Sequence, residues 1–215
     1  MTPRFSKAID PIFLHVLGLL ERMGQGENPL AEEERVRICG WISQAEEQLG
    51  QSREWQLAKY AIVAWIDEVM IDAAWEGRSW WTENSLEWHF FNTNERYYLF
   101  YLKEREAAAL APKDAQEVFY LCVVLGFRGL YRDAGRAAEV AKDHQLPPDL
   151  GSWARQTWMA IRWHPLRPAI SEASRPLEGA SPLEGPFPLV WSTFLGVVLA
   201  AFDVILGWIV FFRQT

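Results

Sequence analysis

Two adjacent acids, Asp67 and Glu68, are the residues whose position in this sequence most needs a chemical explanation. They interrupt the apolar run AIVAWIDEVMI at residues 61–71, where a carboxylate is costly to bury. Neighbouring residues of a helix point about 100° apart, so one acid can face a core while the other faces solvent. A structural role predicts a buried carboxylate that pairs with an arginine such as Arg128 or caps a backbone turn. The residues alone favour this structural role, because ion-pair networks also place acids inside apolar segments.

A binding role is the alternative, because further acids and aromatic residues follow directly. Asp72 and Glu76 come just after the acidic pair, in a segment that also holds three tryptophans. Exposed aromatic side chains close to acids are common at protein interfaces. This hypothesis predicts a partner-binding site made of Asp67, Glu68, Asp72, Trp75 and Glu76. A packed loop between helices explains the tryptophans at least as well.

No other group of residues predicts catalysis, a metal site or a bound cofactor. The four histidines do not pair with one another, or with a cysteine, at the spacing of metal ligands. No serine or cysteine lies in a nucleophile motif, and no glycine-rich loop is suited to phosphate. Cys39 and Cys122 lie in apolar helical patterns and are expected to be core thiols in a reducing compartment. We therefore predict a protein that is not an enzyme and has no small-molecule substrate.

The charge of the chain disfavours some partners and favours others. The formal net charge is −7, from 21 basic and 28 acidic residues in a chain of 215. An acidic protein is a poor ligand for nucleic acid and is repelled by anionic lipid. The sign of the charge therefore favours basic protein partners.

Apolar residues recur at helical spacing over most of the first 164 residues. No stretch alternates with the two-residue period of a strand for long enough to form one. The segment from Asp72 to Thr82 is predicted to be a loop, with Thr82 capping a short helix that runs to Phe91. We predict an all-α domain at residues 1–164, with helices near 5–23, 29–49, 53–71, 82–91, 95–110, 114–125, 136–143 and 150–163.

The remainder of the chain predicts a linker and a membrane anchor. Residues 165–188 hold six of the 12 prolines and repeat Pro-Leu-Glu-Gly, which is typical of a partly extended spacer. Residues 189–212 are apolar apart from one acid, and about 20 such residues cross a bilayer as a helix. The N-terminus lacks the features of a signal peptide. We therefore predict residues 1–164 in the cytoplasm, a transmembrane helix at 189–212 and a short periplasmic tail at 213–215.

The predicted anchor carries small and polar residues along one side. Their spacings of four, four, three and four residues place them in one helical stripe. Small residues let helices approach closely, and a mid-span carboxylate costs on the order of 3 kcal/mol. An acid tolerated in a single helix is the alternative. We predict that the stripe packs against another transmembrane helix, from a second copy or a partner; it consists of Ser192, Gly196, Ala200, Asp203 and Gly207.

Two segments resemble the DotU/TssL (IcmH) family of bacterial type VI and type IVB secretion systems. The first is YAIVAWIDEVMIDAAW at residues 60–75, followed by SLEWHFFN at 85–92. The second is EVFYLCVVLGFRGLYR at residues 117–132, which is similar to the family's Tyr-x-Cys-Leu-x-Leu-Gly-Phe-x-Gly-Arg-Tyr pattern. The chain departs from the family at residues 92–98, where glycines are missing, and at Leu130, where an arginine is usual.

The resemblance implies an inner-membrane component of a secretion envelope complex. Proteins of this family have a cytoplasmic domain that looks like two small helical bundles in a hook, and they form homodimers. They bind the large inner-membrane partner TssM (IcmF) and face the subunits of the cytoplasmic baseplate. Asp67 and Glu68 match the family's acidic pair, which raises the odds of a partner-binding cleft there. The implied function is non-catalytic assembly that docks the envelope complex to the baseplate, in a type VI system ahead of a type IVB system.

Two other classes of function stay open beside this one. A tail-anchored helical regulator that binds partner helices in a groove fits the same architecture. Residues 75–78, WEGR, faintly resemble the Asn-Trp-Gly-Arg signature of apoptosis-type bundles. A membrane-bound enzyme finds less support, because the sequence groups no nucleophile, metal ligands or phosphate loop. We place the secretion-system function ahead of both.

Overall fold

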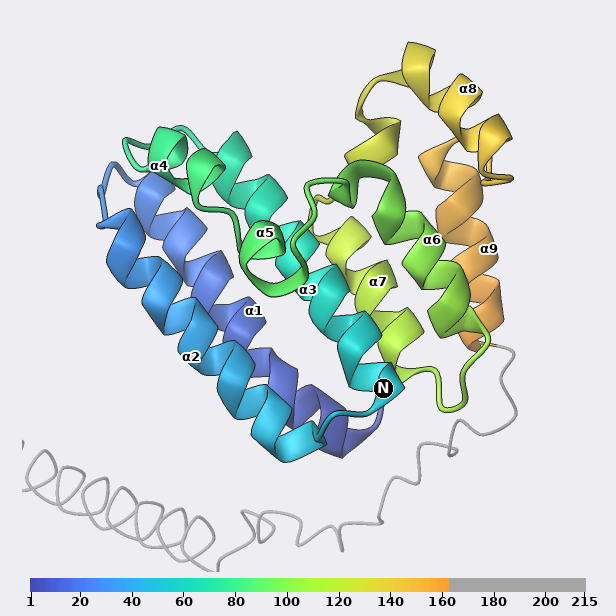
Figure 1. Ribbon diagram of the computed structural model, residues 1–215, viewed down its shortest axis with the longest axis horizontal. Helices are drawn as coiled ribbons and strands as arrows, with labels where there is room; N and C mark the ends of the chain where they lie inside the picture. The colour runs from blue at the N-terminus through green and yellow to red at the C-terminus, as the bar shows by residue number, and fades with distance from the viewer. Residues whose placement is uncertain (163–215) are drawn as a thin grey trace, which may run out of the picture. The chain divides into compact units, whose positions relative to one another are not determined.

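Helices make up most of the chain that the computed structural model describes, which is residues 1–162 without the side chains of Ala134 and Arg136 (Figure 1). No strand occurs within these residues, so the prediction of an all-α domain is confirmed. In chain order the elements are α1 (Pro3–Gly24), α2 (Ala31–Leu49), α3 (Arg53–Asp72), α4 (Arg78–Glu83), α5 (Leu86–Phe91), α6 (Arg96–Ala108), α7 (Asp114–Val124), the 3₁₀ helix η1 (Gly129–Arg132), α8 (Ala134–Asp143) and α9 (Leu150–Arg162).

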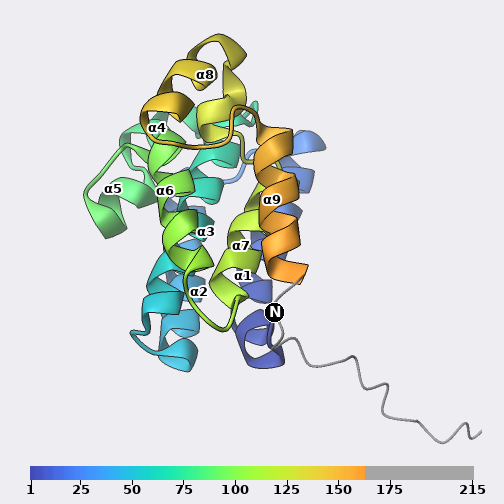
Figure 2. The ribbon, with the colours of Figure 1, turned by 90° about the vertical axis from the view of Figure 1, so that its right-hand side faces the viewer.

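Helix α3 lies at the centre of this arrangement. Every residue from Tyr60 to Glu68 is buried, and a helix that is apolar on all sides belongs in a core. The α1–α2 hairpin lies on one side of α3, while α6 and α7 lie on the other and α9 packs on α7 (Figures 1 and 2). We predicted two small bundles; in the structure the two groups of helices share α3 and one continuous core.

An aromatic cluster joins α6, α7 and α9. The ring of Phe100 is fully buried and stacks on Phe127 with a centroid distance of 4.0 Å. It also meets the edge of Phe119 at 4.8 Å and lies 6.4 Å from the ring of Trp153 on α9. Aromatic pairs of this kind stabilise a core by more than the area that they bury. Phe100 on α6 therefore links its helix to α7 and to α9.

The connection after α3 differs from the prediction. Residues 72–82 are not all loop, because α4 begins at Arg78, and Thr82 caps no helix. The Thr82 hydroxyl instead donates to the carbonyl oxygen of Arg78 at 2.9 Å, and Ser85 caps α5. The physical reason is Trp81, which is fully buried and holds this segment against α3. Sequence periodicity does not reveal a helix of six residues that is fixed by one side chain.

The predicted linker and anchor lie outside the described residues. Within residues 1–162, no helix has both the length and the hydropathy needed to cross a membrane. The predicted span at 189–212, and the stripe of small residues on it, therefore stay predictions.

The aromatic cluster makes a first test of the fold. We expect Phe100→Ala to lower the free energy of unfolding by about 3–5 kcal/mol, because it removes the ring shared by three helices. The matched control is Leu14→Ala on α1, where the side chain is 69% exposed and the expected change is within about 0.5 kcal/mol. Urea unfolding of the detergent-solubilised chain measures both. Equal losses in the two variants would contradict the central position of Phe100.

Candidate functional site

Asp67 is fully buried and its carboxylate is bound on both oxygens by nitrogen donors. The indole nitrogen of Trp81 and the backbone N–H of Leu86 both donate to Oδ1 at 2.9 Å. The backbone N–H of Glu87 donates to Oδ2 at 2.7 Å. The first N–H groups of a helix lack partners within it, and their end of the helix attracts negative charge. Asp67 thus caps the N-terminus of α5 from a different helix.

The environment of Asp67 makes its carboxyl a weaker acid. Burial raises the pKa of Asp67 to about 6, although the hydrogen bonds from Glu87, Leu86 and Trp81 favour the ionised form. Loss of water around the carboxylate therefore outweighs the donors that surround it.

Glu68 points away from Asp67 and binds a different turn. The backbone N–H of Arg128 donates to Oε1 at 2.6 Å, and the N–H of Gly129 lies 3.2 and 3.1 Å from the two oxygens. Arg132 pairs with the same carboxylate at 3.0 Å. Both carboxylates are therefore bound by donors of their own chain, which is the structural role that the apolar sequence around them favoured. The arginine that pairs is Arg132, whereas Arg128 takes part through its backbone.

The turn after α7 has a conformation that only glycine adopts easily. Gly126 ends the helix with φ +112°, and Gly129 has φ +48°. A Cβ at Gly129 would lie 2.7 Å from the carbonyl oxygen of Tyr97, which is too close for any other residue. The turn exposes two backbone N–H groups to Glu68 for this reason. This turn is the LGFRG part of the second segment that carries the family resemblance.

Two further side chains hold the same turn. Trp65 on α3 donates from its indole nitrogen to the carbonyl oxygen of Leu125 at 3.3 Å. Tyr101 on α6 donates from its hydroxyl to the carbonyl oxygen of Arg128 at 2.7 Å. The two segments identified in the sequence, 60–75 and 117–132, thus meet in space around α3 and α7.

Asp72 lies at the rim of a cleft beside the acidic pair. It forms a two-point ion pair with Arg132, in which Nη1 donates to Oδ1 at 2.6 Å, and both side chains are about half exposed. The cleft has a volume of about 290 Å³ and the exposed ring of Tyr97 lies on its wall. It is lined by Glu68, Ile71, Asp72, Asn94, Arg96, Tyr97, Gly129 and Arg132.

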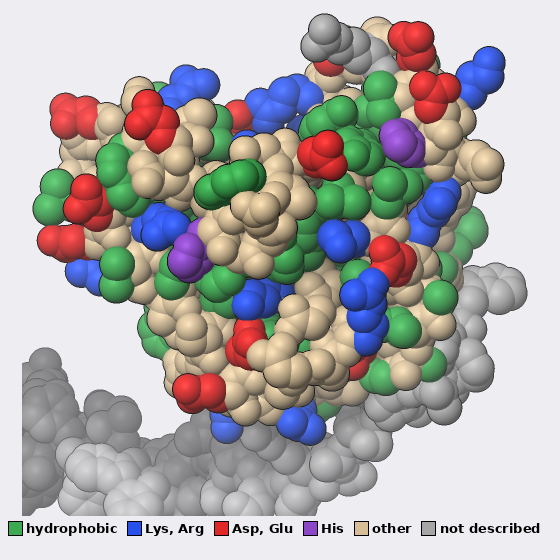
Figure 3. Space-filling model, in the orientation of Figure 1, with side chains coloured by type: hydrophobic (Ala, Val, Ile, Leu, Met, Phe, Trp, Pro, Cys, Tyr) green, Lys and Arg blue, Asp and Glu red, His purple; other side chains and the backbone are tan. Residues whose placement is uncertain are grey.

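Glu76 lines a second, separate cleft, and Trp75 precedes it in the same loop. The half-buried indole of Trp75 donates to the carbonyl oxygen of Met70 at 2.9 Å, and the exposed Glu76 donates its backbone N–H to the Asn28 side chain at 3.2 Å. A cleft of about 450 Å³ lies between this loop and the start of α2, and its charged lining residues are all acidic. Several acidic side chains lie at this end of the molecule (Figure 3). The lining consists of Asn28, Pro29, Leu30, Ala31, Glu32, Glu33, Glu76, Gly77 and Trp80.

The five predicted partner-binding residues therefore divide into two sets. Asp67 and Glu68 point inward and are bound within the chain, whereas Asp72, Trp75 and Glu76 lie at the surface or partly exposed. The structure does not bring the five together around one cavity. Which of them contacts a partner stays a prediction.

Sequence reasoning missed a third buried carboxylate, Glu87. Its Oε1 accepts hydrogen bonds from the hydroxyls of Tyr60 and Thr93 at 2.7 and 2.8 Å and from the N–H of Glu95 at 3.1 Å. Arg96 pairs with its second oxygen at 3.3 Å. These contacts organise residues 92–98, where the chain departs from the family pattern. The position of this acid between the apolar residues Leu86 and Trp88 is the sequence feature that could have indicated its burial.

The described residues hold no group suited to a metal. Among residues 1–162, no three histidine, cysteine, aspartate or glutamate side chains are placed to share an ion. Cys122 is buried, Cys39 is half-buried and both are free thiols. Burial raises the pKa of each thiol.

The comparison with known families agrees with the two segments that meet around α3. The sequence matches the family described as "Type VI secretion system protein DotU" over residues 5–211. This chain belongs to the DotU family. The match identifies a type VI secretion system protein, the alternative that the sequence favoured over type IVB, and it extends through most of the predicted anchor. No curated protein matches the DotU-family chain described here.

A solved structure shows the same fold. The DotU-family chain is similar to the protein in "Crystal structure of T6SS SciP/TssL from Escherichia Coli Enteroaggregative 042", with a TM-score of 0.50 and 21% sequence identity. The likeness covers 68% of this chain and 89% of that chain. At 21% identity the likeness shows the shared helical fold. It does not show that individual side-chain contacts are the same in the two proteins.

The cap that Asp67 provides can be tested by substitution. Asp67→Ala leaves three buried N–H donors without an acceptor, and we expect it to lower the free energy of unfolding by about 3–5 kcal/mol. Asp67→Asn keeps one acceptor oxygen, so we expect about 1–3 kcal/mol. The control is Glu83→Ala at the exposed end of α4, expected within about 0.5 kcal/mol. Urea unfolding followed by tryptophan fluorescence measures all three, and an unchanged Asp67→Ala variant would rule out the cap.

The raised pKa of Asp67 makes its contribution to stability depend on pH. Its folded pKa of about 6 exceeds its ordinary value of 3.8, so between these values the folded state holds a proton that the unfolded state has lost. Stability contributed by Asp67 must therefore fall as pH rises from about 4 through 6. We expect wild type to lose about 1–3 kcal/mol relative to Asp67→Asn between pH 4 and about 7. Unfolding titrations across this range measure the difference, and a constant difference would contradict the shift.

Proposed function

We propose that this chain is a non-catalytic assembly component of a type VI secretion membrane complex. A single span at residues 189–212 holds it in the bacterial inner membrane, with the helical domain in the cytoplasm. The observation that carries this proposal is the family match over residues 5–211, which includes the helical domain, the linker and most of the apolar segment. The likeness of the fold to a TssL structure supports it.

The helical domain acts in this proposal as a docking platform between membrane and cytoplasm. Its partners are a TssM (IcmF)-like inner-membrane protein, the baseplate subunits and a second copy of the chain. The net charge of −7 supports basic surfaces on those partners. The stripe of small residues on the apolar segment 189–212 is the proposed contact between transmembrane helices, because close helix approach needs small side chains.

The contact surface for a partner consists of the outward set, Asp72, Trp75 and Glu76. A partner cannot replace the donors on Asp67 without uncapping α5, nor those on Glu68 without opening the turn at residues 126–129. These two acids therefore do not contact the partner themselves. They hold α5 and the turn at residues 126–129 in place beside the contact surface. Glu76 is the member best suited to a test, because its exposed carboxylate makes no hydrogen bond or ion pair within the described residues.

An affinity purification tests the function and the surface together. The tagged full-length chain is recovered from native membranes in mild detergent, beside Glu76→Lys and a control, Glu47→Lys, at the opposite exposed end of α2. We expect wild type and the control to recover a large TssM-like membrane protein and baseplate subunits. We expect Glu76→Lys to lose one of these partners by about tenfold, because it reverses the charge in an acidic cleft.

Two results would contradict this proposal. Recovery of neither class of partner by a folded, membrane-bound wild type would remove the secretion function and favour the tail-anchored regulator. Equal recovery by Glu76→Lys and Glu47→Lys would leave the function standing and exclude the acidic cleft as the contact. Circular dichroism of each variant confirms that the helices are intact.

A further inference from the structure

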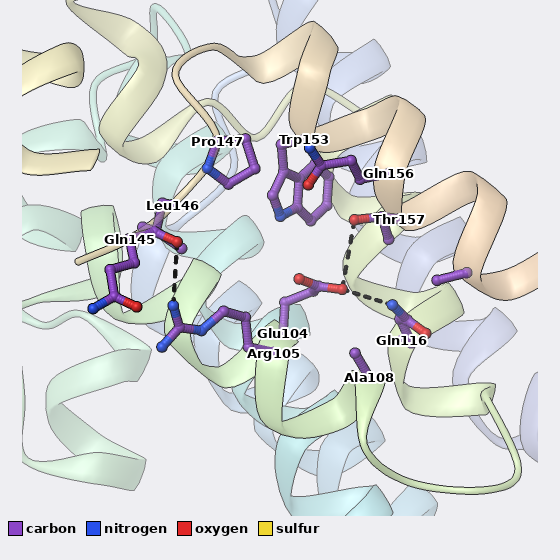
Figure 4. A pocket seen from close by; sticks show the side chains of 11 residues that line it. Glu104, Arg105, Ala108, Gln116, Gln145, Leu146, Pro147, Trp153, Gln156 and Thr157 are labelled. Carbon is purple, nitrogen blue, oxygen red and sulfur yellow. Dashed lines mark hydrogen bonds between the residues drawn. The ribbon is translucent and has the colours of Figure 1, made fainter. Parts of the chain in front are cut away.

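A pocket between α6, α7 and α9 contains polar side chains that the assembly role does not explain. It has a volume of about 230 Å³ and opens beside the connection from α8 to α9 (Figure 4). Its wall combines apolar residues with a buried carboxylate and a buried amide. The lining includes Glu104, Ala108, Gln116, Leu146, Trp153 and Thr157.

Glu104 is a buried acid without a cation beside it. Its side chain is 5% exposed, and Oε1 accepts hydrogen bonds from Gln116 at 2.8 Å and from the Thr157 hydroxyl at 3.5 Å. No lysine, arginine or histidine of residues 1–162 lies within ion-pair distance of its carboxylate. The buried acids Glu34, Glu68 and Glu87, in contrast, each pair with an arginine.

Two cationic side chains near the pocket, Arg105 and Lys113, donate to backbone carbonyl oxygens and not to Glu104. Arg105 follows Glu104 on α6, but its guanidinium points away and donates to the carbonyl oxygens of His144 and Gln145 at 2.9 and 3.4 Å (Figure 4). The ammonium of Lys113 donates to the carbonyl oxygen of Ala108. Neither neutralises Glu104 by contact, so the acid has no basic partner among the residues that the structure describes.

A second residue of the pocket lining has an acceptor without a donor. The carbonyl oxygen of the Gln116 side chain is buried and makes no hydrogen bond, although the residue is only 1% exposed. The indole nitrogen of Trp153 faces Glu104 and is buried without a hydrogen bond of good geometry (Figure 4). Buried polar atoms without partners are rare in native proteins and need an explanation. Here a carboxylate without an ion pair and an amide whose oxygen lacks a donor belong to two residues that line the same cavity.

The acceptors and the size of the pocket indicate which chemical group it can bind. A guanidinium group carries five N–H donors and no acceptor, it is planar, and it is weakly hydrated, so it gives up water at low cost. It matches the carboxylate of Glu104, which has only neutral donors, beside the Gln116 amide, whose oxygen has no donor. A volume of 230 Å³ lies below the range of about 300–1,000 Å³ that is typical of small-molecule sites, and it suits one inserted side chain.

We propose that this pocket receives the guanidinium of an arginine from a partner protein, with Glu104 and Gln116 as its acceptors. The chemistry of the ligand follows from the pocket, whereas its origin in a protein rests on the proposed function. The competing explanation is that Glu104, Gln116 and Thr157 only hold α9 to α6 and α7. That explanation predicts effects on stability and none on the binding of a cation.

The raised pKa of Glu104 supports the need for a cation. Burial raises this pKa, and the hydrogen bond from Gln116 lowers it less than burial raises it. An ionised carboxylate in such a place is stabilised when a positive charge arrives.

The first experiment measures a defined probe on the purified full-length chain in detergent. L-argininamide is compared with L-citrullinamide, which has nearly the same shape and no charge, by saturation-transfer NMR. We expect argininamide to bind at least about tenfold more tightly, and Glu104→Gln to remove this preference. Glu106→Gln is the matched control, because Glu106 lies on the same helix with its side chain 48% exposed. Equal binding of the two probes, or an unchanged Glu104→Gln variant, would overturn the proposal.

A second variant guards against a loss of folding. Glu104→Gln keeps an oxygen acceptor for Gln116 and Thr157, so the helices are expected to stay in place. If thermal unfolding shows that it does not fold, Gln116→Met removes the amide oxygen at similar volume and keeps the carboxylate. We then expect argininamide to bind about three- to tenfold more weakly. Binding of wild-type strength to folded Gln116→Met would also overturn the proposal.

The final experiment identifies the source of the cation. A photocrosslinking amino acid replaces Gln156, an exposed residue at the edge of the pocket, in the full-length chain in native membranes. A crosslink to an arginine-containing peptide that Glu104→Gln abolishes supports a protein source. Argininamide binding without such a crosslink would assign the pocket to a free cationic compound and exclude the partner arginine. Because the affinity purification with Glu76→Lys is independent of Glu104, the proposed function can stand when this inference fails.

Discussion

The fold depends on two neighbouring carboxylates that α3 buries and must satisfy. Burying an ionised carboxylate is affordable only when donors surround it, and this requirement binds α3 to elements on two sides. Asp67 takes the first N–H groups of α5 together with the Trp81 indole. Glu68 takes the N–H groups of the turn after α7 and the guanidinium of Arg132. Because adjacent residues of a helix diverge, one dipeptide can organise two parts of the chain.

This constraint explains why the surface near the acidic pair has its particular composition. The cap on α5 needs Trp81 inside, which leaves Trp75 and Trp80 partly exposed in the same short segment. Arg132 pairs with both Glu68 and Asp72. The exposed Asp72, at the rim of the cleft beside Tyr97, is therefore linked through Arg132 to the buried Glu68. A partner that approached this rim would meet side chains whose positions are fixed by buried contacts. Preorganised surfaces of this kind lose little conformational entropy on binding.

Sequence reasoning reached the helical class and the buried acids because both follow from local patterns. Apolar spacing predicts helices, and an acid in an apolar run predicts a structural carboxylate. It could not choose Arg132 over Arg128, because the glycine turn that rotates the chain between them is a tertiary feature. Nor could it predict α4, whose six residues are held by Trp81 rather than by their own propensity. The cleft beside Tyr97 depends on segments distant in sequence and has no local signal.

The buried acids also separate structural roles from binding roles by a single criterion. A carboxylate that stabilises a fold is expected to find its donors within the chain, as Asp67 does with three N–H groups and Glu87 does with two hydroxyls, a backbone N–H and an arginine. Glu104 has two neutral donors and faces a cavity, next to an amide oxygen that has none. Evolution toward stability alone would replace such an acid by an apolar residue of similar volume, because an unpaired buried charge is destabilising. Its presence therefore points to a charge supplied from outside the described part of the chain.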